Sequence, residues 1–205
     1  MINYRLMAAA FFFYGIFSGL AGQDIHQAAK AGDLEEVARL IGKDPSLLNL
    51  KSSGGSSPLH FAATHEDPAV AEYLLSMGAP VNEYNASGYT PLHYAAVYNR
   101  EAVASVLILH GGDPETCSLE GQTSLHMAAI SGASEVTSIL LDNHAACDSR
   151  DDYGRTPLLL AARESGDVLT AEILLQYGAD IDAVDKNGSG ALELSAWRGY
   201  KTFTE

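Results

Sequence analysis

The chain has 205 residues, 47% of them hydrophobic and 19% charged, which is the balance of a folded protein and not of a disordered one. Its 12 basic and 26 acidic residues give a net charge of −14. This acidic excess argues against a nucleic-acid-binding protein, because contacts to phosphates need clustered Lys and Arg. It favours solubility instead.

The first 22 residues differ in composition from the rest of the chain. Arg5 supplies a positive charge, residues 6–20 form an uncharged apolar run, and small residues follow at Ala21 and Gly22. This layout is typical of a secretory signal peptide, so we predict residues 1–22 as the signal and cleavage after Ala21 or Gly22. The run is shorter than the ~20 residues of a membrane-spanning helix. A retained anchor and an apolar helix packed on the first repeat remain open as alternatives.

From residue 24 onward the chain is organised by a repeated motif. Residues 88–96 read Gly-Tyr-Thr-Pro-Leu-His-Tyr-Ala-Ala, and copies lie 33 residues apart at 55–63, 121–129 and 154–162, with a degraded copy at 188–196. Thr before Pro predicts the start of a helix, because the Thr hydroxyl can cap free N–H groups and Pro at the first helical position loses no hydrogen bond. The small Ala residues would let a neighbouring helix approach closely.

A second helix is expected in each repeat. Apolar residues with helical spacing, such as those at 70–75 and 136–141, predict a buried stripe. Asp67 and Pro68 would start one such helix. Gly78 and Gly178 would end two of them in the left-handed conformation. The residues from there to the next Gly would form a hairpin finger, and no single repeat could bury its own apolar face without its neighbours.

The terminal repeats depart from this pattern. Residues 24–53 lack the Thr-Pro start and read as a capping repeat, in which Asp33 and Glu36 predict a capping box. The fifth repeat carries one extra residue at 164–167, which we place in the turn between its helices. The sixth repeat reaches Glu205 before a full second helix. Two explanations stay open: the aromatic residues of this segment cover the end of the array as a lid, or the sequence is cut short. These aromatic residues are Trp197, Tyr200 and Phe203.

A 33-residue period with a Thr-Pro-Leu-His-x-Ala-Ala signature resembles the ankyrin repeat. The resemblance covers residues 24–205 and implies an all-α ankyrin-repeat solenoid of about six helix-turn-helix repeats with short β-hairpin fingers, so that residues 23–205 form one domain. The first repeat, with its Asp44-Pro45-Ser46 connection, resembles those of bacterial secreted or periplasmic ankyrin-repeat proteins. In repeat register Cys147 matches the apolar position of Ile181, which we expect to be buried. Cys117 lies in the preceding finger, so we expect both thiols to be free.

Residues that suggest catalysis or a metal have a structural interpretation in this register. His60, His93 and His126 stand at the signature position, where the resemblance implies that the imidazole bridges backbone groups of adjacent repeats. His144 and Cys147 lack the four ligands of a closed zinc site, and no phosphate-binding loop is present. We therefore predict no enzyme, no metal and no cofactor. The glycosylation patterns at 85–87 and 187–189 are interpreted as turn chemistry.

Ankyrin repeats bind on a concave face made of the finger tips and the exposed end of each first helix. Tyr, Trp and Arg are enriched among the residues that dominate interfaces, and exposed Val97, Leu119 and Ile130 would be unusual on a surface without a partner. The other interpretation is that the aromatic side chains pack on their own fingers. The predicted partner-binding residues are Tyr89, Val97, Tyr98, Leu119, Gln122, Ile130, Asp152, Tyr153, Arg155, Arg163, Lys186, Trp197 and Arg198.

The sequence thus predicts an exported, non-enzymatic scaffold, periplasmic or secreted, that binds another protein on its concave face. We expect a monomer that has no nucleic-acid partner and no stable membrane contact once the signal is removed. The alternative is a membrane-tethered structural module that keeps its N-terminal apolar segment as an anchor. An enzyme would need a pocket or a metal site that the sequence does not display.

Overall fold

The computed structural model of the chain describes residues 25–198, with side chains up to residue 196. Short first helices and longer second helices alternate along the chain. The predicted signal peptide, the side chains of Trp197 and Arg198, and the proposed lid residues Tyr200 and Phe203 lie outside this description. The elements are α2 (Ile25–Ala31), α3 (Leu34–Lys43), η1 (Pro45–Asn49), α4 (Pro58–Ala62), α5 (Ala69–Ser76), α6 (Pro91–Val97), α7 (Glu101–Leu109), α8 (Ser124–Ser131), α9 (Ser134–Asp142), α10 (Pro157–Leu160), η2 (Ala161–Ser165), α11 (Val168–Gln176) and α12 (Ala191–Arg198).

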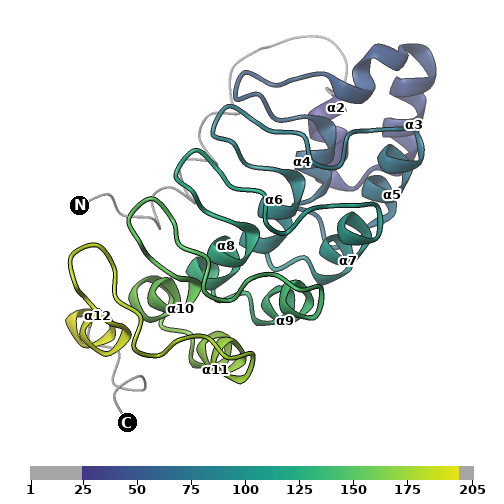
Figure 1. Cartoon of the computed structure of the whole chain (residues 1–205). Helices are drawn as coiled ribbons and strands as arrows, with labels where there is room; N and C mark the ends of the chain where they lie inside the picture. Colours follow the sequence, from purple (N-terminus) through teal and green to yellow (C-terminus); the bar gives the residue numbers. More distant parts are fainter. Residues whose placement is uncertain (1–24, 199–205) are drawn as a thin grey trace.

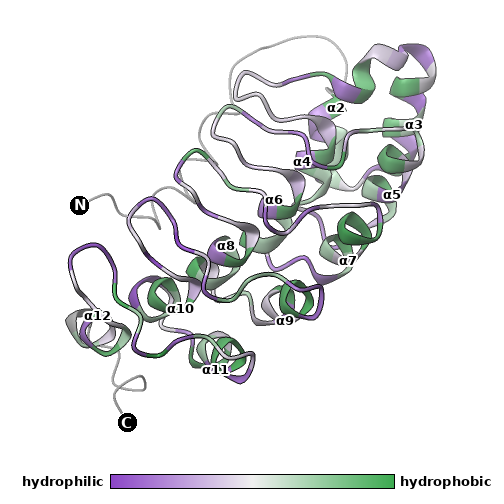
Figure 2. Cartoon of the chain, in the orientation of Figure 1, coloured by the Kyte–Doolittle hydropathy of each residue, from purple (hydrophilic) through white to green (hydrophobic). Residues whose placement is uncertain are grey.

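The helices form two stacked layers (Figure 1). The inner layer consists of α2, α4, α6, α8, α10 and α12, and the fingers project from its side; α3, α5, α7, α9 and α11 form the outer layer. Hydrophobic residues gather on the helices, whereas the fingers are mostly hydrophilic or neutral (Figure 2). The predicted all-α solenoid is confirmed.

The inner helices α4, α6, α8 and α10 begin with a Ser or Thr cap, as the sequence predicts. At α6, the backbone N–H of Thr90 donates to Nδ1 of His93 (3.1 Å), and the Thr90 hydroxyl bonds the same nitrogen (2.8 Å). Histidine thus takes the place that Glu or Gln holds in the usual capping box. The box predicted at α3 forms only in part: Asp33 accepts from the Glu36 N–H at 3.0 Å, but the Glu36 carboxylate pairs with Arg39 instead of reaching back.

One hydrophobic core runs from α2 to α11, and a second, small cluster of Leu159, Ala162 and Ala191 joins α10 and η2 to α12. Leu59, Leu92, Leu125 and Leu158 occupy one register position on successive inner helices and are all buried. The small Ala pairs are buried as well, which allows the close approach of neighbouring helices. Because each repeat supplies only one slice of this core, its stability depends on both neighbours.

The fingers are tight turns and not regular hairpins. In the finger of α6, the Asn85 N–H donates to Tyr89 O (3.0 Å), while the Asn85 side chain accepts from the N–H groups of Ser87 and Tyr89. Within residues 25–198 the fingers contain only one isolated bridge, between Val184 and Gly190. The predicted β-hairpins are therefore wrong in detail, because these side-chain-capped turns replace a strand ladder. The interpretation of residues 85–87 as turn chemistry is confirmed.

Adjacent fingers are joined through their backbones. The Leu119 N–H donates to Ser87 O at 3.1 Å. Gly88, between these fingers, has φ +77°, and a Cβ there would lie 2.7 Å from the Leu119 nitrogen. Both the conformation and the contact therefore require glycine.

The extra residue of the fifth repeat lies earlier than predicted. It is wound into a π-helical turn, η2 (Ala161–Ser165), at the end of the inner helix α10; this turn overlaps the predicted segment 164–167 at two residues but continues the helix and does not belong to the turn between the helices. A single inserted residue commonly enters a helix in this way. Arg163 in this turn pairs with Glu164 at 3.1 Å.

The environments of the two cysteines agree only in part with the predictions made from the sequence. Both cysteines are free thiols, as predicted. Cys147 is half-buried, but Ile181, expected to be buried at the matching position, is 56% exposed. That expectation was wrong.

His144 occupies a position where other repeats have glycine. Its φ is +66°. The glycines at the equivalent positions have φ values of +92° (Gly78), +87° (Gly111) and +88° (Gly178). A side chain in this conformation is strained by about 1 kcal/mol.

His144→Gly is expected to raise the free energy of unfolding by up to about 1 kcal/mol, measured by urea denaturation. Gly111→Ala is the matched control and should lower stability; an unchanged His144→Gly variant would contradict the argument.

Candidate partner-binding surface

The three signature histidines are structural. Nδ1 of His93 accepts from a backbone N–H, so Nε2 carries the proton and donates to Gln122 O of the next finger at 3.0 Å. His60 and His126 make the same bond to Tyr89 O and Arg155 O. Burial lowers the pKa of His60 and His93 to about 4. These neutral, fully engaged imidazoles tie α4, α6 and α8 to the fingers that follow them, as the resemblance implied.

Beneath the fingers lies a row of polar side chains. Asn85 donates to the Tyr94 hydroxyl (3.0 Å), the Tyr89 hydroxyl lies 3.5 Å from Oε1 of Gln122, and Arg155 pairs with Asp151. These contacts hold the fingers over the inner helices. The row therefore supports the concave face from beneath.

Two predicted binding residues belong to this row and not to the surface. Gln122 is 1% exposed and Arg155 is 2% exposed, so the expectation that they lie on the exposed face was wrong. Their register position directly follows the finger glycine. The Tyr89 hydroxyl of the preceding finger lies against Gln122, whereas Arg155 pairs with Asp151 and lies over the Tyr153 ring of its own finger, with its Cζ 4.4 Å from the centroid. Tyr89, at the same position, is half-buried.

The remaining predicted residues form two rows. On the finger tips Leu119 is 74% exposed and Tyr153 is 51% exposed, and Asp152 and Lys186 are exposed beside them. At the ends of the inner helices Val97, Tyr98, Ile130 and Arg163 are half-buried. Trp197 and Arg198 belong to α12, but their side chains lie outside the description. The concave face, as used below, consists of these two rows.

Sequence reasoning missed other exposed apolar residues of the fingers. Tyr84 is 55% exposed and Val184 is 44% exposed. Both directly precede the turn-capping residue of a finger, Asn85 or Asp185. This shared register was visible in the sequence and could have identified them.

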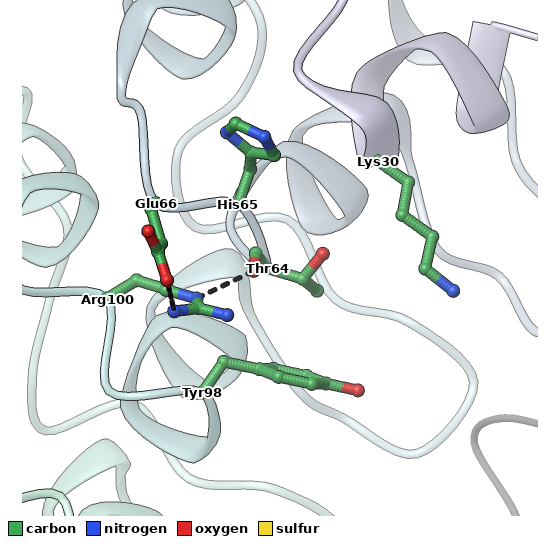
Figure 3. A pocket seen from close by; sticks show the side chains of 6 residues that line it. All are labelled: Lys30, Thr64, His65, Glu66, Tyr98 and Arg100. Carbon is green, nitrogen blue, oxygen red and sulfur yellow. Dashed lines mark hydrogen bonds and ion pairs between the residues drawn. The ribbon is translucent and has the colours of Figure 1, made fainter.

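A pocket of about 360 Å³ opens at the ends of the first three inner helices (Figure 3). Arg100 is fixed there: its Nε donates to Thr64 O at 2.8 Å and its Nη1 to Glu66 at 3.0 Å. Among the residues that line the pocket, Tyr98 alone was predicted from the sequence as a binding residue. The lining residues are Lys30, Thr64, His65, Glu66, Tyr98 and Arg100.

No helix between residues 25 and 198 is both long and apolar enough to cross a bilayer. The same residues contain no group of three or more His, Cys, Asp or Glu side chains placed to hold a metal ion.

Stacked helix pairs with finger turns define a helical repeat solenoid, a class of protein that presents an extended binding surface. A family model of ankyrin repeats, in three copies, matches residues 25–116 and 103–185. The chain belongs to the ankyrin-repeat family, and its array is a protein–protein interaction module.

Curated relatives share only a part of this array. Palmitoyltransferase akr1 of Aspergillus oryzae is 38% identical over 61 residues, which are 30% of this chain and 8% of that protein. Palmitoyltransferase akr1 of Emericella nidulans is 33% identical over 61 residues, with the same coverage of 30% and 8%. The match thus spans less than a tenth of either relative.

Proposed function

We propose that this chain is a non-enzymatic scaffold that binds a partner protein on its concave face. The observation that carries the proposal is the exposure of apolar side chains on that face, Leu119 and Tyr153 on the fingers beside half-buried Val97, Tyr98 and Ile130. Large apolar side chains gathered on one surface are a common feature of interaction sites. Burial of a Leu or Tyr side chain against a partner contributes roughly 1.5–3 kcal/mol.

The negative charge of the protein would act mainly on the rate at which the partner associates. Acidic side chains such as Glu120 and Asp152 lie on the fingers that border the concave face. They would steer a partner with a basic flank, raising its association rate more than its final affinity. We therefore expect association to slow as the salt concentration rises.

We further propose that the protein is exported and acts in the periplasm or outside the cell as a monomer. The support is the sequence of residues 1–22, with its apolar run and small residues before position 23. The intact mass of the protein from fractionated cells tests this proposal. A soluble extracytoplasmic species beginning at Gly22 or Gln23 is expected; a full-length membrane species would favour the tethered module, and a full-length cytosolic species would contradict export.

Tyr98→Ala is expected to weaken binding of the partner at least tenfold without unfolding the array, because an aromatic anchor is removed from the concave face. Trp197→Ala is expected to act in the same way. The matched control is Tyr177→Ala, since Tyr177 is an exposed tyrosine at the end of the outer helix α11. Dissociation constants by calorimetry and circular dichroism of each variant provide the measurement. If both variants bind normally, the proposed face is incorrect.

A further inference from the structure

The C-terminal end of the array exposes apolar residues whose equivalents in earlier repeats are more deeply buried. Leu192 in α12 is 64% exposed, whereas its equivalents on earlier inner helices are at most 1% exposed: Leu59, Leu92, Leu125 and Leu158. Leu175 in α11 is 40% exposed, but its equivalents Leu75 and Leu141 are buried. Ile181, shortly after α11, is 56% exposed. Leu175, Ile181 and Leu192 are called the end surface below.

The end surface lies where a further outer helix would pack. Each outer helix from α5 to α11 contacts both the preceding outer helix and the inner helix of its own repeat. Within residues 25–198, α11 is the last outer helix and no outer helix follows α12 (Figure 1). In earlier repeats the covering helix presents an apolar stripe, for example buried Val136 and Leu140 of α9. The end surface is therefore suited to an amphipathic helix.

The charges around the end surface specify the kind of helix. Residues 168–182, which span α11 and the loop after it, contain no Lys or Arg but three exposed acidic residues, Glu172, Asp180 and Asp182. A second copy of the same surface would bring like carboxylates together, which is unfavourable. A helix that carries Lys or Arg beside its apolar stripe would complement them.

Asp182 also offers a hydrogen-bond acceptor at the end of the array. The side chains at its equivalent positions each accept a backbone N–H of the following repeat at 2.9 or 3.0 Å, and these residues are Asn82, Glu115 and Asp148. Asp182 itself is exposed, and no residue between 25 and 198 donates to its carboxylate. The position that joins successive repeats is thus open to a donor from another molecule.

We propose that the end surface binds a basic amphipathic helix of a partner protein, which takes the place of a further outer helix. Leu175, Ile181 and Leu192 receive the apolar stripe of this helix, and Asp182 pairs with a Lys or Arg beside the stripe. The end surface shares no residue with the concave face. The proposal therefore goes beyond the proposed function and does not depend on it.

The test uses the full chain labelled with ¹⁵N and three blocked peptides of about 18 residues, long enough to form a helix alone. The first peptide has a stripe of Leu and Ala flanked by Lys, and the second has Glu in place of Lys. The third has the composition of the first in an order that forms no stripe. The first peptide is expected to give saturable shifts of the amide signals of Leu175, Ile181 and Leu192. The other two should bind at least tenfold more weakly.

Leu192→Ser should weaken binding of the first peptide at least fivefold and leave the array folded, because this side chain is already exposed. Leu109→Ser, at the exposed end of α7, is the matched control and should leave binding unchanged. Asp182→Asn should weaken binding and make it less sensitive to salt, since one charge pair is lost.

Several results would overturn the proposal: equal binding of the peptide without a stripe, binding insensitive to Leu192→Ser, or no saturable shifts. Binding that appears only after residues 199–205 are deleted would assign the end surface to the chain's own C-terminal residues. Self-association of the full chain that Leu192→Ser abolishes, measured by analytical ultracentrifugation, would assign it to a second copy. Either of these two results also overturns the proposal.

Discussion

Replacing His93 by alanine is expected to lower the free energy of unfolding by about 3 kcal/mol or more, because one side chain makes three kinds of contact. It caps α6 through Thr90, bonds Gln122 O of the next finger, and fills a fully buried site. Each buried group left without a partner costs about 1–3 kcal/mol. Loss of the cap and of the packed ring adds to this.

Urea denaturation followed by circular dichroism measures the effect. His110→Ala is the control, since His110 is exposed at the end of α7, and it should change stability by less than about 0.5 kcal/mol. Because the array is built of repeats, unfolding is to be checked for a single transition before energies are compared. A His93→Ala loss below about 1 kcal/mol would show that the bridge between repeats contributes little.

The second large effect is a loss of stability in mild acid. Burial lowers the pKa of His60 and His93 from the ordinary histidine value of 6.5 to about 4, and it lowers the pKa of His126 as well. The unfolded chain therefore takes up protons first as the pH falls. Stability from these groups is complete above about pH 6.5 and is lost between pH 6.5 and pH 4, by roughly 3 kcal/mol for each of His60 and His93.

Urea midpoints at pH 7.5, 6.5, 5.5 and 4.5 test this dependence. The midpoint is expected to fall steadily below pH 6.5, and His93→Gln should show a shallower fall than the wild type because one titrating group is gone. Carboxylates titrate mostly below pH 5, so the window from 6.5 to 5 reports the histidines. A midpoint that stays constant across this window would refute the assignment.

Much of the fold could be predicted because its signals are local and repeated. Thr90 and Pro91 fix the start of α6, and Gly88 fixes a finger turn through its positive φ and its close contact with the next finger. The same residues recur every 33 positions, so each prediction was supported by several copies. The sequence did not predict the π-helical turn at Ala161–Ser165, because the inserted residue occurs in one repeat only and no other copy shows where it belongs.

The candidate site was predicted less completely because exposure depends on the neighbouring repeat. Gln122 and Arg155 hold a finger position that looks exposed within one repeat, but both are buried in the array, where the Tyr89 hydroxyl of the preceding finger lies 3.5 Å from Gln122. The pocket depends on Lys30, Thr64 and Arg100 from three successive repeats. A motif within a single repeat does not predict which side chains of successive repeats lie together.

The central claim is that the partner binds on the concave face, and site-specific photocrosslinking tests it most directly. The full chain would carry a benzophenone amino acid at position 119, on a finger, or at position 109, at the end of the outer helix α7. Leu119 is 74% exposed and Leu109 is 82% exposed, so the two probes are matched in residue and accessibility. A crosslink to the partner from position 119 and none from position 109 is the result expected. Crosslinking from position 109 alone would contradict the account.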